Sequence, residues 1–346
     1  MNDNFDFPKA PQNEAFMTDK EMKSHKKIFS QIGFAFLSYL LVSQIMADLA
    51  GYLIAYFAPQ LFLSQDFLLI LSSIIQYLVA FPVLFICLRS IPKSEPLSNG
   101  RIGTKKSLKY LVVCMLFIYV GNYISNFLMA KIESILGKMP ENTINIILDN
   151  ANIWVSVLIV GLIGPIFEEL IFRKLFIDRL TPYGDVIAIL LPSLVFGLFH
   201  GNLYQFFYAF LLGVVFSYIY LKTGNLSYTI LLHMFVNLFC GVLPTYIFSV
   251  LDYNQLIELV SAGAITEEYI MANALPIFLF LLYSYGMLAM VGVGIFVFFR
   301  NIKKLTLNKG KIRFPKGATL DVMFFNLGTI ALIAFSIYLI ASNTFG

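Results

Sequence analysis

Long apolar runs recur along the whole chain and are separated by short polar segments. The candidate runs lie at roughly 31–57, 67–88, 110–130, 153–176, 186–200, 205–221, 227–248, 275–299 and 321–341. A helix needs about 20 predominantly apolar residues to cross a bilayer. The pattern predicts an all-α fold, a polytopic bundle of about eight or nine transmembrane helices. The lower number applies if the short fifth run or the ninth run does not cross.

The composition supports a membrane protein. The chain is 59% hydrophobic and 13% charged, whereas soluble domains are about one quarter charged. The three cysteines (Cys87, Cys114 and Cys240) all fall within apolar runs, which is typical of small buried hydrophobes and not of disulfides. The lipid bilayer is the expected surrounding, and no nucleic acid partner is expected.

Basic residues are distributed unevenly among the connecting segments. They gather in "KEMKSHKK" before the first run, in "RSIPKSEPLSNGRIGTKKSLK" and in "RNIKKLTLNKGKIRFPK", whereas 249–274 carries acids and no Lys or Arg. Basic loops face the cytoplasm. The chain is therefore expected to be a multi-pass protein of the cell membrane with a cytoplasmic N-terminus. Residues 1–28 would be a polar tail with His25 in solvent, and 131–152 either an interfacial helix or an ordinary loop.

Two adjacent glutamates interrupt the fourth apolar run, in "GPIFEELIFRKLF". Carboxylates at membrane depth are costly, and they mark functional sites or buried ion pairs. Glu169 and Arg173 are four residues apart with the acid first, the favoured orientation for an ion pair. Glu168 points elsewhere on the helix and has no partner on it, which makes it a candidate general base or metal ligand. The alternative is that both glutamates belong to an ion-pair network that fixes helix packing.

Three further polar residues lie in the runs that follow. His233 and Asn237, in "HMFVN", share a helix face and offer N–H donors to one point, which suits an oxyanion or a water. His200 ends "FGLFH". Taken singly, these residues could be interhelical hydrogen-bonding groups. Taken with Glu168, they supply a base, donors and room for a water, as hydrolysis requires.

These three motifs, in this order, resemble EExxxR, FxxxH and HxxxN of the CAAX prenyl protease and bacteriocin-processing family of intramembrane endopeptidases. The resemblance covers about 153–245. It implies an α-helical membrane protease in which Glu168 and His200 activate a water. By the same resemblance, His233 and Asn237 hold the oxyanion or complete the polar site. The chain would then divide into the tail, N-terminal helices (29–152), a catalytic core (153–248) and C-terminal helices (249–346).

The need for a metal is a separate question. The family is often called a metalloprotease, and Glu168, His200 and His233 could bind Zn²⁺ with one position open. There is no H-E-x-x-H, however, and Asn is a poor zinc ligand. We expect no tightly bound metal. With nine full spans, His200 would lie at the outer end of its helix, whereas His233 would lie about 10 Å from the cytoplasmic start of its own.

The sequence thus predicts an endopeptidase that hydrolyses a membrane-associated peptide or protein. Two other functions use the same residues. One is a non-catalytic scaffold or bacteriocin self-immunity factor that binds its partner in the same cavity. The other is a transporter with Glu168 as proton carrier, against which the lack of a visible inverted repeat argues.

Overall fold

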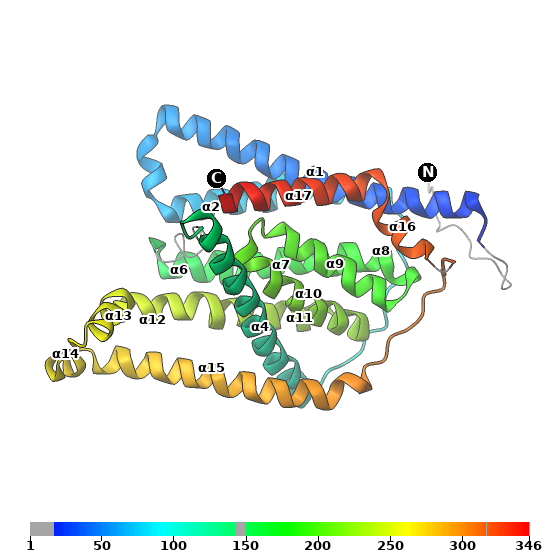
Figure 1. Cartoon of the computed structure of the whole chain (residues 1–346). Coiled ribbons are helices and arrows are strands. Elements are labelled where there is room, and N and C mark those ends of the chain that lie inside the picture. Colours follow the sequence, from blue (N-terminus) through cyan, green and yellow to red (C-terminus); the bar gives the residue numbers. More distant parts are fainter. Residues whose placement is uncertain (1–16, 141, 143–149, 316, 346) are drawn as a thin grey trace.

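The structure is a computed structural model that describes residues 17–140, 142, 150–315 and 317–345. In this part of the chain every regular element is a helix, and a single isolated bridge joins Gly184 to Lys309. Eight of the described helices are long and apolar enough to cross a membrane. The predicted all-α polytopic bundle is therefore confirmed (Figure 1).

The chain order of the helices is as follows. The first half contains α1 (Asp19–Phe57), η1 (Pro59–Leu63), α2 (Gln65–Ile74), η2 (Ile75–Ala80), α3 (Phe81–Arg89), α4 (Thr104–Leu136), α6 (Ile153–Ser156), η3 (Val157–Ile163) and α7 (Gly164–Glu169). Next come η4 (Leu170–Ile177), α8 (Asp178–Leu180), η5 (Thr181–Tyr183), α9 (Asp185–Phe199), α10 (Leu203–Thr223), α11 (Leu226–Asn237), η6 (Leu238–Val242) and α12 (Leu243–Leu251). The last are α13 (Tyr253–Ser261), α14 (Glu267–Ala272), α15 (Ala274–Asn301), η7 (Ile302–Lys304), α16 (Ala318–Phe324) and α17 (Leu327–Phe345).

The first helix begins earlier than predicted. Thr18 and Glu21 form a reciprocal capping box, so α1 starts at Asp19, because the two side chains satisfy backbone N–H groups that have no partner within the helix. The prediction of a solvated tail is therefore wrong for 19–28. His25 is fully buried, with Nδ1 3.1 Å from the Tyr183 hydroxyl and its ring against Phe314. Residues 1–16 lie outside the described part.

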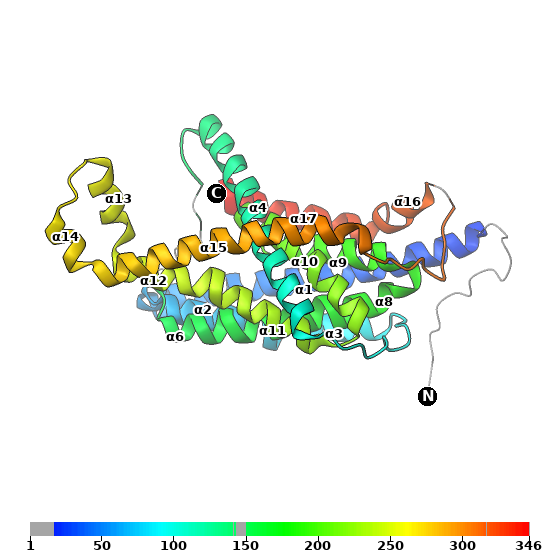
Figure 2. The same cartoon turned by 90° about the horizontal axis from the view of Figure 1, so that it is seen from below.

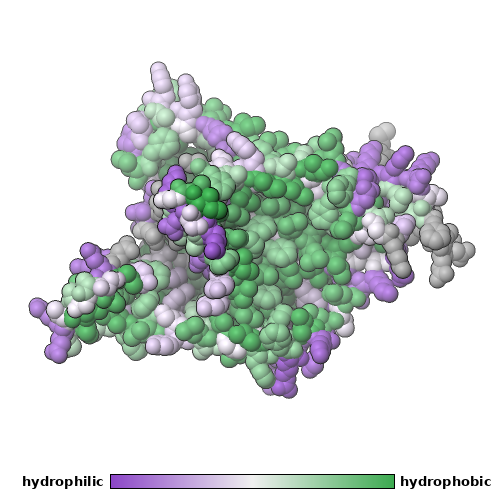
Figure 3. Space-filling view, viewed as in Figure 1, coloured by the Kyte–Doolittle hydropathy of each residue, from purple (hydrophilic) through white to green (hydrophobic). Residues whose placement is uncertain are grey.

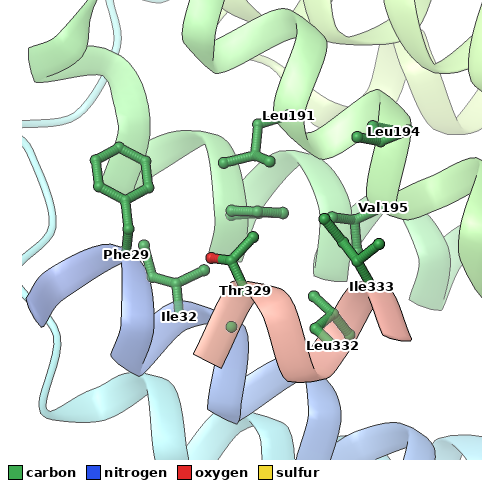
Figure 4. A pocket seen from close by; sticks show the side chains of 10 residues that line it. Phe29, Ile32, Leu191, Leu194, Val195, Thr329, Leu332 and Ile333 are labelled. Atoms are coloured by element: carbon green, nitrogen blue, oxygen red, sulfur yellow. The ribbon is translucent and has the colours of Figure 1, made fainter. Parts of the chain in front are cut away.

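The last helix belongs to the bundle. α17 packs along α1 (Figure 1), and the contacts of Ser30 with Gly328 and of Ile32 and Gly33 with Thr329 show that the two run parallel. A side chain on Gly33 or Gly328 would collide with the facing backbone, as at other close crossings of membrane helices. Beside this crossing an apolar hollow of about 10 Å³ lies between α1, α9 and α17 (Figure 4). It is too small for a ligand.

The middle of the bundle surrounds α10. This helix packs against α4, α9 and α11 and against η4, and α15 closes the far side against α4 and α12 (Figures 1 and 2). At one end, Lys222 at the end of α10 lies 2.7 Å from Asp185 at the start of α9. Tyr220 donates a 2.8 Å hydrogen bond to Asp178 at the same end. These contacts hold the ends of α8, α9 and α10 together.

Two further segments complete the description, and the first is as short as its apolar run predicts. The fifth run forms α9, which has 15 residues and a length of about 22 Å, less than the ~30 Å hydrocarbon core. The acidic segment 249–274 contains two short helices, α13 and α14. The segment 131–152, expected to be an interfacial helix or a loop, begins as the end of α4, and most of 141–149 lies outside the described residues. Figure 3 shows a hydrophobic band across the middle of the molecule with hydrophilic groups gathered towards its two ends.

Candidate active site

Four π-helical segments interrupt the helices around the polar residues. They are η2, η3, η4 and η6. Single π-turns inside α-helices occur frequently at functional sites. Here, η3 and η4 flank α7, which carries both glutamates, and η6 begins directly after Asn237. The π-turns redirect side chains and carbonyl groups towards the space between η2, α7, α9 and α11.

Glu169 is the centre of a buried charge network. Its side chain is fully buried, and Arg173 Nε lies 3.1 Å from Glu169 Oε2. The Arg173 guanidinium is also fully buried and lies over the rings of Phe196 and Phe216, 4.8 and 5.3 Å from their centroids, within the range of cation–π attraction. The ion pair inferred from the spacing is therefore formed, and it lies in a dry aromatic environment.

His233 joins the two glutamates. Its Nδ1 lies 2.9 Å from Glu169 Oε1, and its Nε2 lies 3.6 Å from Glu168 Oε2. A carboxylate only accepts hydrogen bonds, so Nδ1 of His233 carries a proton and donates a hydrogen bond to Glu169. The ring is thereby oriented with Nε2 towards Glu168. Glu169 thus contacts both Arg173 and the imidazole, a role that the helix spacing alone did not indicate.

Glu168 differs from its neighbour in exposure. Its side chain is 26% exposed, whereas that of Glu169 is not exposed at all. The carboxylate interacts electrostatically with His200 and with three tyrosines from three other helices, Tyr39, Tyr77 and Tyr208. Glu168 is therefore a partly exposed acid close to histidine side chains and tyrosine hydroxyl groups.

His200 lies at the turn between α9 and α10. Its Nδ1 is 2.8 Å from the Phe196 carbonyl, so Nδ1–H donates to that carbonyl and Nε2 keeps a free lone pair. Gly201 follows in the left-handed conformation (φ +63°), and Asn343 of α17 donates a 2.9 Å hydrogen bond to its carbonyl. His200 is half-buried at this turn, which directly follows the short α9.

Asn237 lies one helical turn beyond His233. Its Nδ2 donates a 2.9 Å hydrogen bond to the Val160 carbonyl, in the π-helical segment before α7. A carboxamide has two N–H donors, so one remains for another acceptor. Val160, Gly164 and Glu168 follow at four-residue intervals, and Asn237 therefore contacts the same helix that carries Glu168.

The sequence analysis missed the tyrosines and Asn343. Tyr77 and Tyr39 come from helices without a recognisable motif, and aromatic residues are too frequent in the chain, with 19 tyrosines, to single them out. Asn343 lies in the last span, to which no role was given. Only the three-dimensional arrangement relates these residues to Glu168 and His200.

The side chains do not form a ready metal site. Among the described residues no three His, Cys, Asp or Glu side chains are arranged so that they could hold a metal ion. His233 Nδ1 is held by Glu169, and its Nε2 lies 3.6 Å from Glu168 Oε2. No chemical step is therefore assigned to a metal.

These observations define the class of protein: a polytopic helical membrane protein with a buried acid–histidine site between its central helices. Comparison with known proteins agrees. Residues 150–239 match the family model described as "Type II CAAX prenyl endopeptidase Rce1-like". This segment holds all seven residues of the three motifs, and the chain is similar to that family over it.

Three relatives illustrate the similarity. The chain is 28% identical over 180 residues to the "Putative membrane peptidase YdiL" of Bacillus subtilis (strain 168), which covers 50% of this chain and 71% of that protein. It is 28% identical over 137 residues to the "UPF0177 protein YxdF" of Lactococcus lactis subsp. lactis (strain IL1403), 39% of this chain and 76% of the relative. It is 31% identical over 107 residues to the "Membrane-embedded CAAX protease MroQ" of Staphylococcus aureus (strain USA300), which covers 29% of this chain and 43% of that protein. No solved structure gives a significant match. A metalloprotease is not supported by these comparisons.

Proposed function

We propose that this protein is an intramembrane endopeptidase that hydrolyses a peptide bond of a membrane-associated peptide or protein with a water activated by Glu168 and His200. The observation that carries the proposal is the difference between the two adjacent glutamates. Glu169 is fully buried and paired with Arg173 and His233, whereas Glu168 is partly exposed. Glu169 therefore holds the surrounding side chains in place, whereas the Glu168 carboxylate is free to accept a proton.

The reaction follows from the positions of the donors and acceptors. Glu168 accepts one proton of the water, and the lone pair on Nε2 of His200 accepts a hydrogen bond from the other. The water oxygen attacks the carbonyl carbon, and the negative charge on the carbonyl oxygen is stabilised by the N–H of Asn237 that does not bond the Val160 carbonyl. His233 completes the polar site. The proton held by Glu168 then passes to the amide nitrogen. The C–N bond breaks, and the products are a carboxylic acid and an amine.

Burial of the site supports this assignment. Electrostatic interactions are stronger in a site that excludes bulk water, and the donors need no reorganisation during the reaction. His233 is 3% exposed, and its orientation is fixed by Glu169.

The basic segments near the start of α1 and after α15 favour a cytoplasmic N-terminus. We propose that no tightly bound metal takes part.

The test is proteolysis by the purified protein in liposomes. A library of quenched fluorescent peptides, each attached to a lipid anchor, is mixed with wild type, Glu168→Gln and His200→Ala. Glu133→Gln is the matched control, because Glu133 is an exposed carboxylate on α4. We expect cleavage by wild type and the control and a loss of about 10²–10⁴-fold in the two site variants, the usual contribution of general acid–base catalysis.

Equal cleavage by wild type and Glu168→Gln would refute the proposal. Retention of the biological activity by a Glu168→Gln, His200→Ala double variant would instead favour the scaffold or self-immunity function, in which the cavity binds a partner without hydrolysis.

A further inference from the structure

Among the three tyrosines that interact with Glu168, Tyr77 has its ring stacked on the segment that carries this glutamate. Its ring lies parallel to that of Phe167, with 4.5 Å between centroids and 11° between planes. Phe167 immediately precedes Glu168. The side chain of Tyr77 is 9% exposed, so its hydroxyl group is held within the pocket by packing of the ring.

The Tyr77 hydroxyl and the Glu168 carboxylate face one small space beside Gly164. A methyl group placed on Gly164 would lie 3.4 Å from Tyr77 Oη, 3.7 Å from Glu168 Oε1 and 3.3 Å from the Ile159 carbonyl oxygen. Its three nearest atoms are thus all oxygens, in a part of the chain that is otherwise apolar. Oε1 is the carboxylate oxygen that does not face His233, because the 3.6 Å contact is made by Oε2.

The hydroxyl group is not used elsewhere. Within the described part of the chain, Tyr77 makes no hydrogen bond, and it interacts electrostatically with Glu168 and Tyr39. The other two tyrosines differ. Tyr208 already accepts a 2.8 Å hydrogen bond from Gln205. The Tyr39 ring is stacked on Phe199, and its hydroxyl group is not among the three atoms nearest to a methyl group on Gly164.

We infer that the Tyr77 hydroxyl positions the reacting water by donating a hydrogen bond to its oxygen, over the open side of Gly164. The inference rests on the proposed function. A water that donates its two hydrogens to Glu168 and His200 has two lone pairs. The Tyr77 hydroxyl occupies one lone pair, and the other is directed to the substrate carbonyl. Tyr77 transfers no proton in the reaction and returns unchanged, so the balance of the hydrolysis is not altered.

The arrangement also explains why a glycine and a π-turn precede the glutamates. Any larger side chain at position 164 would extend into the space between the three oxygens. The π-turn of η3 brings the Ile159 carbonyl to this space, where it accepts the Gly164 N–H. Gly164, one turn before Glu168, therefore leaves room for the water and lies where the π-turn directs the Ile159 carbonyl.

The experiment compares Tyr77→Phe with Tyr283→Phe in the full chain. Both changes remove only a hydroxyl group, and Tyr283 likewise packs its ring on a phenylalanine, Phe239, at 5.4 Å, but on α15 and away from Glu168. Steady-state cleavage gives kcat and KM. We expect Tyr77→Phe to lower kcat by roughly 10- to 100-fold, the usual effect of losing a hydrogen bond in a charged site. We expect KM within about twofold and no change in Tyr283→Phe.

A second measurement does not depend on cleavage. The infrared difference spectrum between each protein and its Glu168→Gln derivative isolates the carboxylate bands of Glu168. We expect these bands to shift in Tyr77→Phe and to stay in place in Tyr283→Phe, because removal of the hydroxyl changes the hydrogen bonding around the carboxylate. Unchanged bands, or wild-type kcat in Tyr77→Phe, would overturn the inference. Failure of wild type to cleave any peptide, with the bands shifted, would refute the proposed function and leave the Tyr77–Glu168 coupling standing.

Discussion

Replacing the two adjacent glutamates by glutamine should affect different properties: Glu169→Gln should lower stability, and Glu168→Gln should lower catalysis. Glu169→Gln removes a fully buried charge from Arg173 and from His233, at 3.1 and 2.9 Å. The guanidinium is then buried without a counter-charge. Breaking a buried pair in this way costs about 3–5 kcal/mol, and we therefore expect a large loss of stability.

Glu168→Gln should hardly change stability. The carboxylate is 26% exposed, and its contact with His233 is 3.6 Å long, so the pair resembles an exposed one, which contributes about 0–1 kcal/mol. Its catalytic effect should be large, because the glutamine cannot accept a proton from water. The two substitutions change the same atoms, and their effects separate because only one of the side chains is sealed in the core.

The assay is thermal unfolding in detergent micelles, followed by circular dichroism, alongside peptide cleavage at a temperature where both variants are folded. We expect the midpoint to fall by roughly 5–10 °C in Glu169→Gln and to change by less than about 2 °C in Glu168→Gln. An Arg173→Met variant should resemble Glu169→Gln. Equal unfolding midpoints for the two glutamate variants would show that the buried network does not support the fold.

Three further outcomes are expected. Asn237→Leu should lower kcat, because leucine has no donor for the oxyanion, and steady-state kinetics check this. Thermal unfolding of Asn237→Leu and Asn237→Asp measures the effect of each change on stability. Asn343→Ala removes the hydrogen bond to Gly201, so we expect a loss of about 0.5–1.5 kcal/mol, measured as a lower unfolding midpoint, together with a fall in cleavage of a few fold as the His200 turn loosens. Treatment with 1,10-phenanthroline followed by gel filtration should leave cleavage unchanged; lost activity restored by added Zn²⁺ would contradict this account.

Part of the site could be predicted because helix periodicity is a local property. The four-residue spacing of Glu169 and Arg173 placed them on one face, and the structure shows the ion pair. The same reasoning placed His233 and Asn237 on one face of α11. Apolar runs of about 20 residues likewise marked the spans. These predictions depend on neighbours in sequence, which a single chain displays directly.

The remaining features depend on contacts between distant segments. His233 was expected to hold an oxyanion, to complete the polar site or to bind a metal, and no local pattern indicated that Glu169 in another helix would orient it. His25 was expected in solvent, because its neighbours in the sequence are basic, and the structure buries it against Tyr183 and Phe314. No local pattern signals the π-turns, whereas the short α9 corresponds to the short fifth apolar run.

The most direct test of the account follows the oxygen of the reacting water. A single turnover of the reporter peptide by liposome-embedded protein in H₂¹⁸O is analysed by mass spectrometry, with wild type and Glu168→Gln in parallel. The account predicts that one ¹⁸O enters the newly formed carboxyl group, that no peptide becomes attached to the protein, and that Glu168→Gln gives almost no product. A covalent peptide adduct, or equal product from both proteins, would contradict it.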